Sequence, residues 1–174
     1  WLLKLGGANR VNTYSPFRDL TDADLVRLNE WTGRCVVALE GSRRNARIGV
    51  LYPIETAWTR FKPSRQGTGE AGPLSERLAS TIRGVDDLLY GARREFSYLD
   101  SRTLMEAQIQ DGELRRGELA WSVVILPDTD TLPQAAWAAL ERFWEAGGVV
   151  IAAGALPRNS EREFPSPGVT SYGQ

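Results

Sequence analysis

The stretch from Trp121 to Pro157 reads WSVVILPDTDTLPQAAWAALERFWEAGGVVIAAGALP, and it decides the fold of the chain. It holds two short apolar runs, at 123–126 and 149–153, on either side of an amphipathic segment. A short apolar run bounded by turn residues is typical of a strand buried on both faces. Two such strands flanking a helix predict a βαβ unit with a right-handed crossover.

The segment between the two runs predicts a helix with one buried stripe. The stripe has helical spacing and is formed by Ala136, Trp137, Leu140, Phe143 and Trp144. We expect Asp130 or Thr131 to cap the helix, with Pro133 in its first turn. Gly147 is expected to end the helix, because glycine enters the left-handed conformation at little cost.

The same alternation of strand and helix continues through the rest of the chain. Apolar runs at 46–52 and 96–99 predict two more strands. Helical spacing of apolar residues over 74–89 predicts a long helix between them, and 108–119 predicts short strands and turns. The sequence therefore predicts an α/β fold of three layers, with helices on both faces of a mostly parallel sheet of about four to five strands.

Three segments are expected along the chain. An N-terminal loop and helix occupy 1–42, the α/β domain occupies 43–157, and an irregular tail occupies 158–174. Thr21, followed by acidic residues, predicts the N-cap of the first helix. The first residue is Trp1 rather than Met, from which we expect a processed chain or an excerpt of a longer one.

Composition narrows the classes of function. The formal net charge is −1, and no apolar run approaches the roughly 20 residues of a membrane helix, so we expect neither a nucleic-acid nor a membrane partner. The chain has no histidine and one cysteine, Cys35, which removes His-based nucleophile pairs and the commonest metal ligand. We therefore expect no metal and no cofactor. The lone cysteine slightly favours a cytoplasmic source.

Four carboxylates follow the expected strands, at the edge where open α/β sheets bind ligands. They are Glu55, Asp100, Asp128 and Asp130. Paired carboxylates could serve glycoside hydrolysis, but nothing in the sequence brings two of them to a defined spacing. We favour the structural interpretation, in which Asp100 and Asp130 cap helices and Asp128 lies in a turn, because capping preferences already account for these residue types.

Trp58 follows the first strand of the sheet. Its indole could stack on a sugar ring, or it could pack under the loop that follows. Trp58 and the four carboxylates are thus the candidate ligand-binding residues, and no catalytic residue is predicted.

Several motifs together resemble a known family. They are RIGVLYPIETAW at 47–58, FSYLDSRTL at 96–104, QDGELRRGELAWSVVILP at 110–127 and ALERFWEAGGVVIAAGALP at 139–157. This series resembles the glutamine-amidotransferase-like domain that follows the catalytic barrel of several glycoside hydrolases. In β-galactosidases that domain is called the trimerisation domain, and α-L-rhamnosidase-type enzymes carry similar ones. The resemblance covers about residues 46–157, and the preceding helix resembles the one that leads out of the barrel.

The resemblance implies a flavodoxin-like fold of the class I amidotransferase type without amidotransferase chemistry. That chemistry needs a cysteine nucleophile and a histidine base, whereas Cys35 lies on the leading helix and no histidine exists. The leading hypothesis is a non-catalytic structural or oligomerisation domain of a glycoside hydrolase. Its expected partners are the parent's catalytic barrel or identical subunits, and carbohydrate at the sugar site. The alternative is a stand-alone sugar or small-molecule binding module that uses the strand carboxyl ends.

Overall fold

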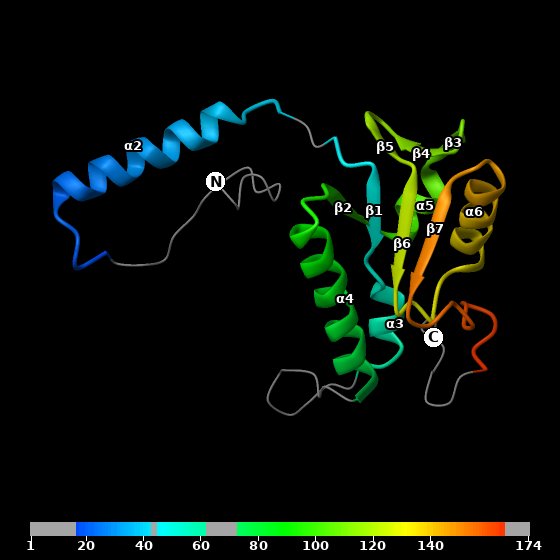
Figure 1. Cartoon of the computed structure of the whole chain (residues 1–174). Helices are drawn as coiled ribbons and strands as arrows, with labels where there is room; N and C mark the ends of the chain where they lie inside the picture. Colours follow the sequence, from blue (N-terminus) through cyan, green and yellow to red (C-terminus); the bar gives the residue numbers. More distant parts are fainter. Residues whose placement is uncertain (1–16, 43–44, 62–72, 166–174) are drawn as a thin grey trace. The chain divides into compact units, whose positions relative to one another are not determined.

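The computed structural model describes residues 17–42, 45–61 and 73–165 (Figure 1). The chain divides into two compact units, Trp1–Arg44 and Asn45–Gln174. Residues 1–16 of the expected N-terminal segment, and 166–174 of the expected tail, lie outside the described residues. No helix in the described ranges is long and apolar enough to cross a membrane.

The first unit contains helix α2 (Asp22–Ala38). Its predicted N-cap is confirmed: the Thr21 side chain accepts a hydrogen bond from the Asp24 amide, and the Asp24 carboxylate accepts one from the Thr21 amide. These two bonds form a capping box, which satisfies two amides that a helix start leaves without partners. Cys35 is buried on this helix.

The second unit is built on a sheet of four parallel strands, which confirms the predicted fold class. The strands lie in the order β2-β1-β6-β7. Their bounds are β1 (Ile48–Leu51), β2 (Phe96–Leu99), β6 (Val123–Pro127) and β7 (Val149–Ala153). The chain runs outward from β1 to β2, returns to place β6 beside β1, and then runs outward in the other direction. The strand order therefore reverses between β1 and β6.

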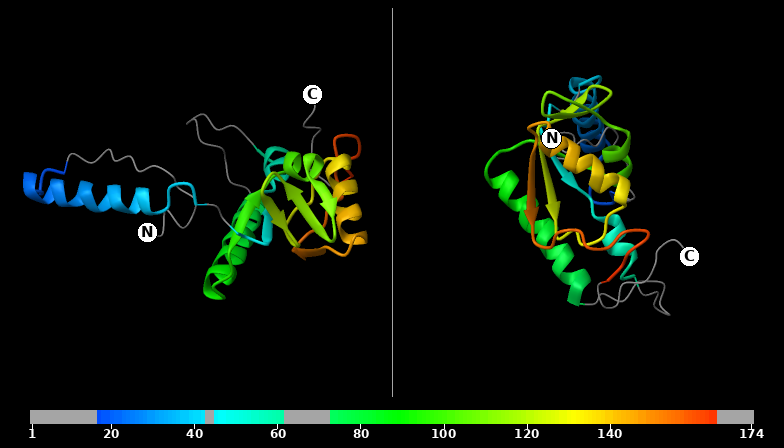
Figure 2. Two further views of the ribbon diagram at one scale, coloured as in Figure 1. Left: turned by 90° about the horizontal axis from the view of Figure 1, so that it is seen from above. Right: turned by 90° about the vertical axis from the view of Figure 1, so that its right-hand side faces the viewer.

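Helices cover both faces of this sheet (Figures 1 and 2). Their bounds are α3 (Ile54–Trp58), α4 (Pro73–Gly91), α5 (Ser101–Glu106) and α6 (Gln134–Glu145). Val85 and Leu89 of α4 pack against Val50, Phe96 and Ile125 on one face. The larger core lies on the other face, where residues of α5 and α6 pack against Leu51, Leu99, Val124 and Leu126.

A small antiparallel sheet follows α5, in the segment predicted to hold short strands and turns. It consists of β3 (Gln108–Gln110), β4 (Glu113–Arg116) and β5 (Leu119–Trp121). Asp111 and Gly112 connect β3 to β4 with φ angles of 52° and 71°, as a two-residue hairpin turn requires. Leu114 and Trp121 of this small sheet pack in the larger core of the unit. The Trp121 indole N–H donates a hydrogen bond to Ser97 Oγ at 2.8 Å.

The C-terminal end of α6 has a Schellman motif, as its glycines predict. Gly147 has a φ of 96°, its amide donates to the Trp144 carbonyl, and the Gly148 amide donates to the Phe143 carbonyl. Two predictions for this helix are wrong. Pro133 occupies the N-cap position in place of Asp130 or Thr131, and Trp144 is 66% exposed rather than buried. Trp144 is exposed because β7, the strand that follows α6, is the last of the described strands in the sheet order, and no described strand lies beyond it to cover the indole.

Gly148 gives a test of this packing. A Cβ at Gly148 would lie 2.2 Å from the Phe143 ring, which is fully buried, so we expect Gly148→Ala to lower the free energy of unfolding by about 1–3 kcal/mol. Gly84→Ala on α4 is the matched control, because nothing lies within 4 Å of a Cβ at this position. This substitution should raise the free energy of unfolding by roughly 0.5–1 kcal/mol. Denaturant unfolding measures both. Equal stabilities of the two variants would contradict the described packing.

Candidate functional site

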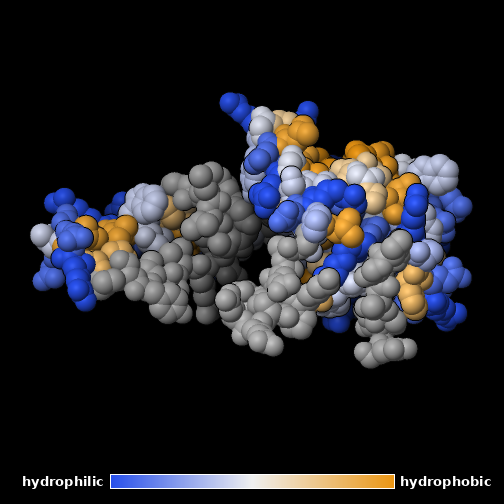
Figure 3. Space-filling model, turned by 90° about the horizontal axis from the view of Figure 1, so that it is seen from below, coloured by the Kyte–Doolittle hydropathy of each residue, from blue (hydrophilic) through white to orange (hydrophobic). Residues whose placement is uncertain are grey.

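The carboxyl ends of the parallel strands meet at the lower edge of the sheet in Figure 1. Open α/β sheets bind ligands at this edge, at the point where the strand order reverses. Here that point lies between β1, which leads into α3, and β6, which leads into residues 128–133. Viewed from this side, hydrophilic and hydrophobic residues are interleaved on the surface (Figure 3).

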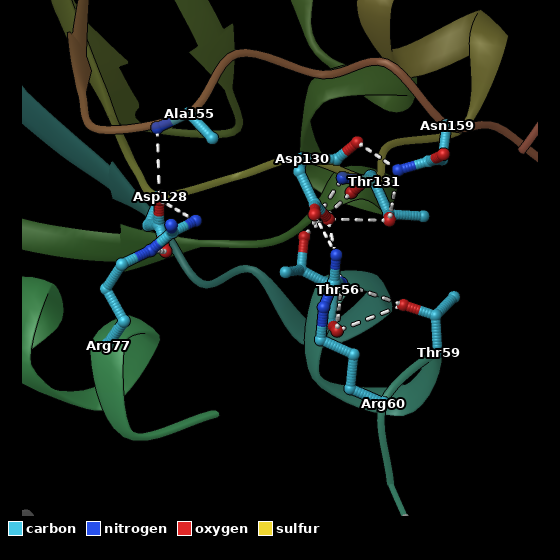
Figure 4. Close-up of polar contacts among 9 residues, drawn as sticks. All are labelled: Thr56, Thr59, Arg60, Arg77, Asp128, Asp130, Thr131, Ala155 and Asn159. Atoms are coloured by element: carbon cyan, nitrogen blue, oxygen red, sulfur yellow. Dashed lines mark hydrogen bonds and ion pairs between the residues drawn. The ribbon is translucent and has the colours of Figure 1, made fainter. Parts of the chain in front are cut away.

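Contacts within the protein close this reversal point (Figure 4). Thr56 on α3 accepts a hydrogen bond from the Thr131 amide at 3.1 Å, and its hydroxyl donates to the Thr131 carbonyl at 3.3 Å. Arg60, just after α3, makes a bidentate ion pair with Asp130, in which Nη1 lies 2.9 Å from Oδ1 and Nη2 contacts Oδ2. The two charged side chains are only 9% and 13% exposed. The crevice in which a ligand would lie is thus held shut by a buried ion pair.

Asn159 reinforces this closure from the C-terminal segment. Its side-chain amide donates to the Asp130 carbonyl at 3.0 Å and to Thr131 Oγ1 at 3.4 Å. The Thr131 hydroxyl in turn donates to Asp130 Oδ1 at 2.8 Å. The predicted capping role of Asp130 is therefore wrong, because its carboxylate is engaged by Arg60 and by its own neighbour Thr131.

Asp128 lies at the bend directly after β6, where the sequence predicts a turn. Its carboxylate accepts hydrogen bonds from Arg77 Nε at 2.8 Å, Arg77 Nη2 at 3.0 Å and the Ala155 amide at 3.0 Å. Burial alone would raise the pKa of Asp128, but the hydrogen bonds from Arg77 and Ala155 and the charge of Arg77 outweigh it and hold the pKa below the ordinary 3.8. Gly154 leaves room for this carboxylate, because a Cβ there would lie 2.8 Å from Oδ1.

Of the other two carboxylates, Asp100 follows β2 directly, and Glu55 lies in the first turn of α3, which follows β1. Asp100 caps α5 as predicted, accepting from the Thr103 amide at 2.7 Å, and its hydrogen bonding with Thr103 lowers its pKa. Glu55 is buried, and its Oε1 accepts a hydrogen bond from the Ser101 hydroxyl. Its Oε2 has no partner within the described part of the chain.

The candidate residues therefore do not converge on one site. Each carboxylate has a different partner, and within residues 17–42, 45–61 and 73–165 no group of three or more acids and cysteines could hold a metal ion. Two surface grooves of about 370 and 300 Å³ lie along α6, and none of the five candidates lines either. Trp58 is 59% exposed, so its indole is open to solvent. The loop proposed to cover it, 62–72, lies outside the described residues.

Sequence reasoning missed the basic partners. Arg60 and Arg77 have no local signal, because they lie 70 and 51 positions from the acids that they bind. Comparison of the chain with protein-family models, with curated proteins and with solved structures gives no match.

Removing Asp130 should be costly. Asp130→Ala leaves a buried guanidinium without its counter-ion, so we expect a loss of about 3–5 kcal/mol in the free energy of unfolding. Glu106→Ala is the control, because the Glu106–Arg116 pair is 51% and 43% exposed and should contribute less than about 1 kcal/mol. Replacing both partners, as Arg60→Met with Asp130→Leu, should recover part of the loss. Similar costs for Asp130→Ala and Glu106→Ala would rule out a buried pair.

Asp128 should make stability depend on acid pH. Because its folded-state pKa lies below 3.8, its contribution is present above that value and is lost as the pH falls through the lower, folded-state pKa. We expect Asp128→Asn to lower the free energy of unfolding by about 1–2 kcal/mol at neutral pH. The value is modest because the Arg77 side chain is 55% exposed, so that solvent screens its charge. The difference in the free energy of unfolding between wild type and variant should become smaller below about pH 4. Urea unfolding at a series of pH values measures it, and a gap that stays constant into acid would contradict the ion pair.

Proposed function

We propose that this chain is a non-catalytic structural domain of a glycoside hydrolase. In this role it packs against a catalytic barrel elsewhere in the parent protein, or against identical subunits. The observation that carries the proposal is the closed reversal point, where Thr56 and Arg60 bind Thr131 and Asp130. A sheet whose usual ligand crevice is filled by its own ion pair is suited to support other parts of a protein.

The arrangement of acids supports the non-catalytic part of the proposal. Glycoside hydrolysis by a retaining or inverting mechanism needs two carboxyl groups facing one bond, about 5–9.5 Å apart. Asp128 and Asp130 are each neutralised by an arginine, and Asp100 caps a helix. Amidotransfer lacks support as well, because Cys35 is buried on α2 and the chain contains no histidine.

The motif resemblance supports the glycosidase parent, and its motif residues have structural roles here. The segment at 47–58 supplies β1 and α3 with the closing Thr56. The Asp111–Gly112 pair forms the hairpin turn before β4. Gly147 and Gly148 form the Schellman motif that ends α6. These structural roles support the proposal of a scaffold domain.

An activity assay tests the non-catalytic assignment. We expect the purified chain to release no nitrophenol from nitrophenyl β-galactoside or α-L-rhamnoside above the buffer rate, and Glu55→Gln and Asp128→Asn to behave identically. Turnover by the wild-type chain that Glu55→Gln abolishes, with folding intact by circular dichroism, would overturn the proposal. Turnover unaffected by both substitutions would indicate a contaminating hydrolase.

The exposure of Trp58 favours a second candidate, a sugar-binding module. An indole that is 59% exposed beside the sheet edge could stack on the apolar face of a sugar ring. Tryptophan fluorescence during titration with galactose or rhamnose distinguishes the two candidates. The structural proposal predicts no saturable change at millimolar sugar, whereas binding at this residue predicts a change that Trp58→Ala removes and Trp144→Ala, the matched exposed control, retains.

A further inference from the structure

Within the described residues, β7 is an edge strand without the usual protection. It is the last strand in the sheet order, and its sequence, Val149–Ala153, contains no charge and no proline. In the right-hand view of Figure 2, β7 and α6 lie on the side of the unit that faces the viewer. Natural edge strands are commonly blocked by lysine, proline, a bulge or a covering segment, because their free amides and carbonyls can pair with another strand.

Apolar side chains flank this edge on both faces of the sheet. Val149 and Ile151 are 48% and 45% exposed, on the face that α4 covers elsewhere. On the opposite face lies a groove of about 300 Å³ lined by Trp137, Leu140, Glu141, Trp144 and Val150. Both the backbone and the side chains of β7 are therefore ready to receive another strand.

We infer that β7 pairs, antiparallel and edge to edge, with β7 of a second copy of this chain. A two-fold axis at Ile151 places this residue opposite its own copy, and Val149 opposite Ala153. The same pairing continues the sheet from four strands in one copy to eight in the dimer.

Charge supports a second copy as the occupant. Glu145 ends α6, four residues before β7 begins, and Arg158 lies five residues after β7 ends, with its amide bonded to the Asp130 carbonyl. Both are exposed, and neither belongs to an ion pair among the described residues. Antiparallel pairing brings the end of the sheet near Glu145 in one copy toward the end near Arg158 in the other, twice per dimer. Parallel pairing would place like charges together.

The apolar area sets the strength of the dimer. Trp144, Val149 and Ile151 together expose on the order of 300 Å², within the range of the largest patches on monomeric proteins. A standard interface buries about 800 Å² on each partner, so the strand backbone and flanking groups must supply the rest. We therefore expect a reversible dimer that forms at high micromolar concentration.

This inference rests on the proposed structural function and names its partner. The competing occupant of the edge is the parent's catalytic barrel, in which case the isolated chain would have no partner in solution. The activity assay and the association measurement are independent. Turnover would overturn the non-catalytic role and leave the dimer standing, whereas a monomer would overturn the dimer and leave that role standing.

The test is sedimentation velocity of the full 174-residue chain from micromolar to millimolar concentration. We expect a monomer–dimer equilibrium that Ile151→Lys weakens by at least about tenfold, because two lysines would lie directly opposite each other. Leu88→Lys is the control, because Leu88 on α4 is 73% exposed and lies outside the proposed interface. A monomer at every concentration, or a dimer weakened equally by both substitutions, would overturn the inference.

Cross-linking tests the register without depending on the lysine variant. Residues directly opposite in an antiparallel pair have Cα atoms about 4.5–5.5 Å apart, within the range that a disulfide spans. In a Cys35→Ala background, Ile151→Cys should therefore oxidise to a covalent dimer, and Leu88→Cys should not. A dimer in solution whose Ile151→Cys variant fails to cross-link would place the interface elsewhere and overturn the pairing.

Discussion

The carboxyl edge of this protein depends on one buried ion pair, between Arg60 and Asp130. Removing two charges from water costs several kcal/mol for each ion, so such a pair contributes little net stability, and its value lies in the geometry that it fixes. Here it ties the turn after α3 to the loop after β6, and the Thr56–Thr131 hydrogen bonds lie beside it. These contacts form a closed joint across the edge at which this fold ordinarily takes up a ligand.

Asp128 and Asp130, which follow β6, bind different elements around the sheet. Asp130 holds the segment after α3, and Asp128 holds α4 through Arg77 and the segment after β7 through the Ala155 amide. A single bend in the chain thus connects elements on both sides of the central strand pair. Both carboxylates are thereby engaged by partners within the protein.

Local chemistry made part of this predictable from the sequence. The apolar run Phe96–Leu99 has the bounds of β2, Asp100 caps the next helix, and Gly147 ends α6, each from preferences that act within a few residues. The sequence predicts a cap at Asp130 because local preferences cannot reveal its true partner, Arg60, which lies 70 positions away. The sequence predicts a buried Trp144 because helical spacing indicates which face of a helix is apolar. It does not indicate that the neighbouring strand lies at the edge of the sheet.

The closed joint and the open β7 edge are the two observations on which the proposed structural role and the proposed dimer rest. Amide hydrogen exchange at Thr131 tests the closed joint most directly, because this buried amide donates to Thr56 across the reversal point. The account predicts that Thr131 exchanges as slowly as the amides of β6, which report global unfolding. Exchange at the rate of an open loop would show that the crevice opens in the folded protein, and it would contradict the central claim.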